Sequence, residues 1–237
     1  MLIYGHRGAM GESSENTLAS FAHLRQIGVH HVELDIRLAD NELIVLHDST
    51  VDRTTSAQGR ADDFSLPELQ ALGIPSLKEV LQAWPELQRI QLEVKTDDLG
   101  NTEPKAYYAS VANKLAEIIA QFKLEQVAII TSIDPEFLFY TRAKMPHQPH
   151  GLVVDPETLA ETQQTVTEMI ELASTLQCEC FLPNHELVTE ALVETIHQQG
   201  MALCTWTVNS TDRGLQLQSL NIDGLITDFP SRFLEAL

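Results

Sequence analysis

Short apolar runs alternate with longer amphipathic segments along the whole chain. Compact apolar or alternating runs are typical of strands, whereas apolar residues spaced three and four apart are typical of helices. With one run at 43–47 set aside, the predicted strands begin near residues 2, 32, 90, 127, 151, 178, 202 and 224, and a helical pattern follows each. Eight strand–helix units in a chain of 237 residues predict a (β/α)8 TIM barrel. An open doubly wound sheet is the lesser alternative, because the glycine fingerprint that usually follows its first strand is absent.

The run LIVLH at 43–47 interrupts this alternation. Only Ala39 to Glu42 separate it from the strand at 32–37, and a parallel connection needs about a dozen residues, so the two runs should form an antiparallel hairpin. From Ser49 to Pro75 the chain is polar and irregular, which is long for an ordinary connection. We therefore expect one domain over 1–237, in which 43–75 forms a hairpin arm and a small insert after the second strand.

Alternation within the strand at 32–37 brings two acids together. Glu33 and Asp35 lie two positions apart, so both side chains project from the same face. Neighbouring carboxylates repel each other unless a positive charge lies between them, and a divalent cation held by oxygen ligands is the usual solution. The same stretch ends in His47-Asp48, a histidine beside an acid. It therefore offers half of a metal site and a candidate proton-transfer group.

Polar residues also stand at the ends of other predicted strands, where TIM barrels place their active sites. The candidate set comprises His6, Arg7, Glu33, Asp35, His47, Glu93, Lys95, Trp206, Asn209 and Asp228. Taken singly, each has a structural explanation, such as Lys95 serving as the counter-ion of Glu93. Taken together, so many ionisable groups at one rim would be costly to bury without a function.

The other histidines carry less information. His185, just after the sixth predicted strand, is a candidate substrate contact. The remaining ones are expected on helices or loops as solvated residues: His23, His30, His31, His147, His150 and His197.

Composition excludes several classes of partner. The formal net charge is −19, which disfavours nucleic acid and anionic membranes. No apolar stretch reaches the roughly 18 residues of a transmembrane helix, and the N-terminus lacks the pattern of a signal peptide. Of the three cysteines, Cys178 and Cys180 are expected to be reduced, and with the distant Cys204 they make a poor zinc pattern. We predict a cytoplasmic protein. The oligomeric state stays open.

The charges of the candidate site indicate a reaction. Three carboxylates, one divalent cation, Arg7 and Lys95 sum to a small positive charge, which suits a monoanionic phosphodiester. Arginine clamps phosphate oxygens, and lysine stabilises charge on a single oxygen. Of two histidines on opposite sides of the phosphorus, one would take a proton from the nucleophile and the other would give one to the leaving alkoxide. The cation would stabilise the developing negative charge.

A series of short motifs runs through nearly the whole chain. In order they are His6-Arg7-Gly8, Glu15-Asn16-Thr17, Glu33-Leu34-Asp35, His47-Asp48, Asp52-Arg53-Thr54-Thr55, Pro75-Ser76-Leu77, Leu92-Glu93-Val94-Lys95, Trp206-Thr207-Val208-Asn209 and Asp223 to Asp228. Together they resemble the glycerophosphodiester phosphodiesterase family, in its bacterial cytoplasmic form.

That resemblance implies metal-dependent hydrolysis of glycerophosphodiesters, such as glycerophosphocholine or glycerophosphoethanolamine, to sn-glycerol 3-phosphate and an alcohol. It implies an acid–base pair of His6 and His47. It also implies one divalent cation, Mg²⁺ or Ca²⁺ with Mn²⁺ as a further option. The implied metal ligands are Glu33, Asp35 and Glu93, and the implied substrate contacts are Arg7, Lys95 and Trp206. Which histidine is the acid, and whether water or the glycerol 2-hydroxyl attacks phosphorus first, are left open.

Two departures from the family pattern bear on the alcohol. Ser14 stands where the family usually has proline, and the segment from Leu72 to Pro75 is shorter than is common, so the preferred alcohol does not follow from the sequence. Two other functions stay open. One is a phospholipase C-like or D-like enzyme on the same fold, and the other is a non-catalytic phosphate- or metal-binding barrel, which would leave the two histidines without a role.

Overall fold

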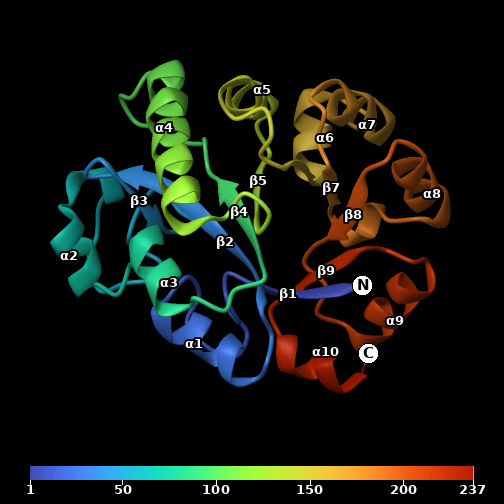
Figure 1. Ribbon diagram of the computed structural model, residues 1–237, viewed down its shortest axis with the longest axis horizontal. Helices are drawn as coiled ribbons and strands as arrows, with labels where there is room; N and C mark the ends of the chain where they lie inside the picture. The colour runs from blue at the N-terminus through green and yellow to red at the C-terminus, as the bar shows by residue number, and fades with distance from the viewer. Residues whose placement is uncertain (237) are drawn as a thin grey trace.

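Eight parallel strands form a closed barrel, and helices surround it in the computed structural model, which describes residues 1–236 (Figure 1). The barrel strands are β1 (Leu2–His6), β2 (His31–Ala39), β4 (Arg89–Val94), β5 (Ala128–Ser132), β6 (His150–Val154), β7 (Cys180–Pro183), β8 (Ala202–Thr205) and β9 (Gly224–Thr227). They neighbour one another in the order β1-β9-β8-β7-β6-β5-β4-β2, and pairing of β1 with β2 closes the ring. The predicted TIM barrel is confirmed, because a doubly wound sheet would leave two edges unpaired.

The strand β3 (Glu42–Val45) runs antiparallel to β2, with Ile36 opposite Val45 and Ala39 opposite Glu42. Asp40 and Asn41 between them both have positive φ angles, 47° and 55°, which is the backbone of a two-residue hairpin turn. The predicted hairpin is therefore confirmed. It carries the chain out of the barrel and back to its rim at His47.

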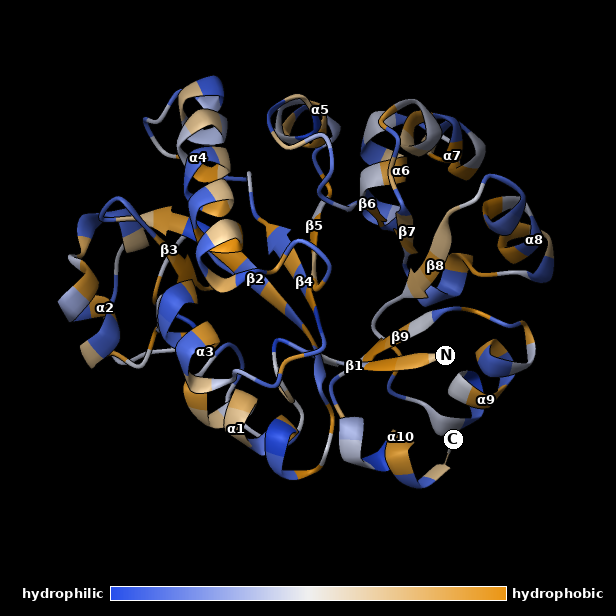
Figure 2. Ribbon diagram, in the orientation of Figure 1, coloured by the Kyte–Doolittle hydropathy of each residue, from blue (hydrophilic) through white to orange (hydrophobic). Residues whose placement is uncertain are grey.

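Ten helices follow within residues 1–236, and most begin at a side-chain cap. They are α1 (Leu18–Gln26), α2 (Leu66–Ala71), α3 (Leu77–Ala83), α4 (Pro104–Phe122), α5 (Pro135–Lys144), α6 (Pro156–Thr162), α7 (Val166–Thr175), α8 (Glu190–Gln198), α9 (Thr211–Ser219) and α10 (Pro230–Ala236), with 3-10 turns at Ala61–Asp63 and His185–Leu187. Ser76 and Glu79 form the capping box of α3 that their spacing indicates. Figure 2 shows hydrophilic and hydrophobic stretches alternating along these helices, as expected of elements with one face on a core.

The segment from Ser49 to Pro75 is more ordered than its polar sequence suggests. It contains α2, whose N-terminus is capped by Ser65 and Glu68, and whose Leu69 packs with Ile44 and Ile74 in an apolar cluster of its own. Six residues are too few to display a helical period, so the sequence pattern could not reveal this helix.

Two faces of the barrel strands are filled differently. On β2, Val32, Leu34 and Ile36 point outward and pack against the helices. Inside the barrel, Tyr4 and Leu182 belong to an apolar cluster contributed by β1, β6, β7, β8 and β9. The inward positions of β2 carry Glu33 and Asp35 instead, so the barrel interior changes from apolar to ionic at this strand.

Two predictions about the histidines are wrong. His31 lies in β2 rather than on a helix or loop, and it is only partly exposed. His150 is not solvated but lies in β6 with no exposed surface, where Nδ1 is 2.7 Å from the Gln148 carbonyl oxygen and Nε2 is 3.0 Å from Thr141 Oγ1. Burial and the charge of Arg142 lower the pKa of His150 to about 4. The polar partners come from a helix and a loop, and the local sequence gives no sign of them.

The substitution His150→Gln should make stability less dependent on pH. Folded His150 stays neutral down to about pH 4, whereas the unfolded chain takes up its proton near pH 6.5. The unfolded state therefore binds more protons in this window, and the native state loses stability as pH falls. We expect the slope of the unfolding free energy to drop by up to about 1.4 kcal/mol per pH unit, measured by urea unfolding across the window. The exposed His147→Gln is the matched control, and an unchanged slope in His150→Gln would contradict the interpretation.

Candidate active site

A cleft of about 900 Å³ opens at the C-terminal ends of the barrel strands. Seven of the eight site residues predicted from the sequence line it, namely His6, Arg7, Glu33, His47, Glu93, Lys95 and Trp206. The eighth, Asp35, lies beside them with 1% of its surface exposed. The fold therefore brings together residues from β1, β2, β4, the segment after β3, and the end of β8.

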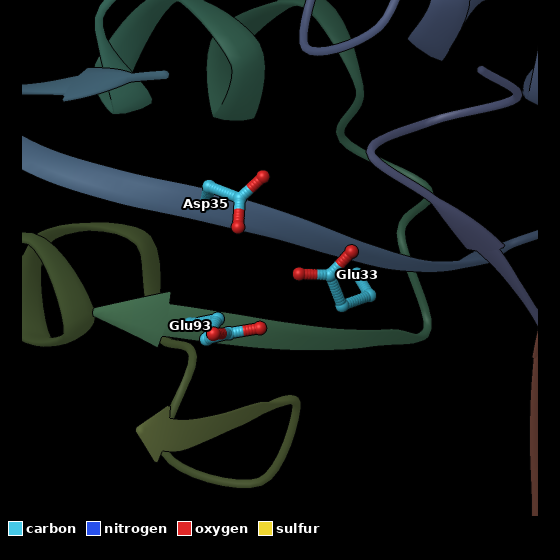
Figure 3. A group of neighbouring side chains, drawn as sticks. All are labelled: Glu33, Asp35 and Glu93. Atoms are coloured by element: carbon cyan, nitrogen blue, oxygen red, sulfur yellow. The ribbon is translucent and has the colours of Figure 1, made fainter. Parts of the chain in front are cut away.

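Glu33, Asp35 and Glu93 form an acidic cluster on two neighbouring strands (Figure 3). Asp35 is paired in register with Glu93, and one oxygen from each of the three carboxylates lies within 4.8 Å of the others. Oε1 of Glu33 is buried without a hydrogen-bond partner. Burial and the neighbouring Asp35 raise the pKa of Glu33 to about 8. Three carboxylates with one unsatisfied oxygen are a donor set that fits a hard divalent cation.

Two cations contact this cluster. Lys95 Nζ lies 3.1 Å from Asp35 Oδ1 and also contacts Glu93. Arg7 Nε lies 3.2 Å from Asp35 Oδ2. Burial alone would raise the pKa of Asp35, but the charges of Lys95 and Arg7 bring it well below its usual value. Both residues expected to bind phosphate are thus already paired with carboxylates of the cluster.

The turn after β1 explains the first motif. Gly8 has a φ of 89°, and a Cβ there would lie 2.3 Å from Ser20 Oγ, so only glycine fits. In this tight turn the backbone N–H of Asn16 donates to the Arg7 carbonyl oxygen at 2.8 Å. The Asn16 side chain then donates to Asp35 Oδ2 at 2.9 Å. The motif therefore contributes a further polar partner for a buried acid of the cluster.

His6 is held by residues from the other end of the chain. Its Nδ1 lies 2.6 Å from Asp228 Oδ1, and Asn209 Nδ2 donates to Asp228 Oδ2 at 2.6 Å. Burial would lower the pKa of His6, but the hydrogen bond to Asp228 and the charge of Glu33 raise it overall. Because Nδ1 is engaged, Nε2 is the ring nitrogen left for the cleft.

His47 has the same kind of partner. Its Nδ1 lies 2.7 Å from Asp48 Oδ1, and its carbonyl oxygen accepts a hydrogen bond from Arg37 Nε at 2.8 Å. Burial lowers the pKa of His47, and the charges of Lys95 and Arg7 lower it further against the opposing effect of Asp35. Arg37 is itself buried and was not recognised from the sequence as a support of the site.

The sequence predicted only some of the other residues that line or adjoin the cleft. Trp206 Nε1 donates to the Leu182 carbonyl oxygen at 2.9 Å, which fixes the ring against the cleft wall. His185 is not among the lining residues, although its neighbour Asn184 is. Helix α6 and its N-cap after β6 add the acids Asp155, Glu157 and Glu161, for which the sequence offered no signal because they belong to none of the motifs. Glu15 and Arg53, which contact each other near the rim, were marked only by motif membership.

Comparisons with known proteins agree with this geometry. The model of the glycerophosphoryl diester phosphodiesterase family matches residues 6–232. A glycerophosphodiester phosphodiesterase from Caldanaerobacter subterraneus is 29% identical, over 98% of this chain and 96% of the relative. The crystal structure of a glycerophosphodiester phosphodiesterase from Thermotoga maritima matches with a TM-score of 0.81 and 25% identity, over 99% of this chain and 97% of the other. The fold is also that of a phosphodiesterase from Oleispira antarctica in complex with the product sn-glycerol-3-phosphate, with a TM-score of 0.83, 22% identity, and coverage of 100% and 96%.

The family match spans far more than half of the chain and includes the residues of the cleft from β1 to β9. The family and the enzyme class expected from the motifs are thereby confirmed. The chain belongs to the glycerophosphoryl diester phosphodiesterase family.

Proposed function

We propose that this protein hydrolyses glycerophosphodiesters to sn-glycerol 3-phosphate and an alcohol, with the help of one divalent cation. The observation that carries the proposal is the shared cleft, in which three clustered carboxylates lie beside two histidines that are each paired with an acid. Support comes from the Oleispira antarctica homologue, whose structure contains sn-glycerol-3-phosphate.

The acidic cluster would hold the cation, which is Mg²⁺, Ca²⁺ or Mn²⁺ because carboxylate oxygens suit all three. When bound, this ion supplies positive charge that stabilises negative charge on the phosphoryl oxygens. Glu33, Asp35 and Glu93 are the ligands in this proposal. Arg7 and Lys95 line the same cleft, and they would bind the non-bridging oxygens from the side of Asp35.

The histidines carry the protons. Each has Nδ1 fixed on a carboxylate, Asp228 for His6 and Asp48 for His47, so each presents Nε2 to the substrate. The Nε2 of one histidine accepts the proton of the attacking hydroxyl group while the oxygen of that hydroxyl group bonds to phosphorus. The other donates a proton to the alcohol oxygen as its bond to phosphorus breaks.

The alcohol of the substrate would occupy the outer part of the cleft, near Trp206. A cleft of about 900 Å³ has room for the small head groups of glycerophosphocholine or glycerophosphoethanolamine, which are the substrates proposed for the first assays.

A second candidate is a phospholipase D-like activity on lipids. It is favoured by the apolar side of the cleft, formed by Ile133, Val153, Leu182 and Ile226, which would accept an acyl chain. Within residues 1–236, no helix combines the length and apolar character needed to cross a membrane. Parallel assays with glycerophosphocholine and lysophosphatidylcholine separate the two candidates, and binding of both without product release would favour a non-catalytic barrel.

Divalent cations should stabilise the protein through the acidic cluster. A cation at about 100 times its Kd adds about 2.7 kcal/mol, which corresponds to a rise in Tm of roughly 5–10 °C for a chain of this size. Differential scanning fluorimetry with Mg²⁺, Ca²⁺ or Mn²⁺, reversed by EDTA, measures this rise. Glu33→Gln and Glu93→Gln should abolish it, whereas Glu157→Gln, an acid on the outer wall of the cleft, should retain it. A full rise in both cluster variants would place the ion elsewhere.

His6→Ala and His47→Ala should each lower kcat for glycerophosphocholine by about 10²–10⁴-fold, since each removes one proton-transfer group. Release of glycerol 3-phosphate is measured by a coupled enzymatic assay, and far-UV circular dichroism checks the fold. His197→Ala is the control, because His197 contacts Asp223 and is not among the residues lining the cleft. Near-normal turnover in either cleft variant would remove that histidine from the acid–base pair.

A further inference from the structure

Arg53 reaches two carboxylates from the turn that follows β3. Its Nε donates to Asp48 Oδ2 at 2.6 Å and its Nη2 lies 3.2 Å from Asp48 Oδ1. On its other edge, Nη1 and Nη2 donate to Glu15 Oε2 and Oε1 at 2.7 and 2.9 Å. One guanidinium therefore makes a two-pronged contact with each of two acids, which is the geometry in which arginine binds carboxylates best.

Each of these acids serves a residue of the cleft. Asp48 Oδ1 is the partner of His47 Nδ1 at 2.7 Å. Glu15 Oε1 accepts a hydrogen bond from Arg7 Nη1 at 3.0 Å. Arg53 does not line the cleft, but it contacts the acid behind His47 and the acid behind Arg7.

We propose that Arg53 is a positioning residue, which fixes Asp48 and Glu15 and thereby sets the ring orientation and tautomer of His47 and the place of Arg7. The assignment rests on the proposed role of His47 in catalysis. It explains the Asp52-Arg53-Thr54-Thr55 motif, because Arg53 in the segment after β3 would hold two acids that contact active-site residues.

The surroundings of the two acids support this task. Glu15 has only 10% of its side chain exposed, and Asp48 has 27%. Without Arg53 these two anions would face each other, and Asp48 Oδ2 would lose the one side-chain donor that contacts it within residues 1–236. The hydrogen bond from Arg53 is the largest effect that opposes burial and lowers the pKa of Asp48 to about 2, so Asp48 stays an acceptor for the proton on His47 Nδ1.

The other histidine shows the same arrangement with a different support. Asp228, the partner of His6, is held by the side-chain amide of Asn209. Asp48, the partner of His47, is held by Arg53. Each ring thus has an acid behind it, and each acid has a second group that fixes its direction.

An ordinary surface ion pair is the competing explanation. Arg53 has 46% of its side chain exposed, and exposed ion pairs contribute little to stability. Arg60 provides the matched control on the same segment, because it pairs with Asp62 and Asp98 at 3.0 Å but contacts no residue of the cleft.

The first test is kinetic and uses glycerophosphocholine with Mg²⁺. Arg53→Gln should lower kcat by about 10–100-fold, as losses of supporting groups behind active-site residues do, while Arg60→Gln stays within twofold of the wild type. Arg53→Lys should recover part of the loss, because one ammonium group cannot hold both acids in two-pronged contacts. In an Asp48→Asn background, adding Arg53→Gln should cost less than about threefold, because coupled residues are not additive.

The second test needs no turnover. Nitrogen-15 NMR of the His47 ring should show a single tautomer with the proton on Nδ1 in the wild type and in Arg60→Gln, and a mixture of tautomers in Arg53→Gln. A kcat of Arg53→Gln within twofold of wild type, or an equal loss in the Asp48→Asn background, would overturn the assignment, as would an unchanged His47 tautomer. If the wild type released no glycerol 3-phosphate, the proposed function would fail while the NMR result still decided the role of Arg53.

Discussion

The mutual repulsion of three carboxylates inside the barrel mouth is the constraint on which the site depends. Glu33, Asp35 and Glu93 are placed together by the alternation of one strand and its register with the next. Carboxylates that leave water need charge compensation and hydrogen bonds, since a buried unpaired charge is costly. Lys95 and Arg7 supply part of that compensation, and the unpartnered Oε1 of Glu33 is where the protein itself supplies none.

From this cluster an unbroken series of contacts runs outward to the segment after β3. Asp35 contacts Arg7, Arg7 contacts Glu15, and Glu15 contacts Arg53. Arg53 in turn holds the acid behind His47, so the series returns to the cleft. Opposite charges alternate along the whole path, so each of the three acids, Asp35, Glu15 and Asp48, contacts at least one arginine.

The two histidines differ in their electrostatic surroundings although their immediate partners are alike. His6 lies 3.9 Å from Glu33, and the acids around it raise its pKa. At His47, burial and the charges of Lys95 and Arg7 lower the pKa against the opposing effect of Asp35. This difference in pKa between the two histidines is caused by protein groups alone. A bound cation would change the pKa of both rings.

The sequence by itself determined the barrel, the hairpin and most of the rim residues. Strand alternation put Glu33 and Asp35 on one face, and the short link from Ala39 to Glu42 forced an antiparallel pair. These are local properties with periods of a few residues, so the order of amino acids alone determines them. The acidic cluster also follows, once neighbouring parallel strands are assumed to end at one rim.

Only the tertiary structure decided which groups support that rim. His6 and Asp228 are 222 positions apart, and Arg53 is 38 positions from Glu15, so no local pattern links either pair. The burial of His150 and the short helix α2 were likewise hidden, because burial depends on how β6 packs in the barrel and six residues are too few to show a helical period. Most residues that line the cleft lie at strand ends, where the fold class predicts them. The residues that lie behind them, such as Asp228 and Arg53, come from distant parts of the chain, and their positions are fixed only when the whole barrel closes.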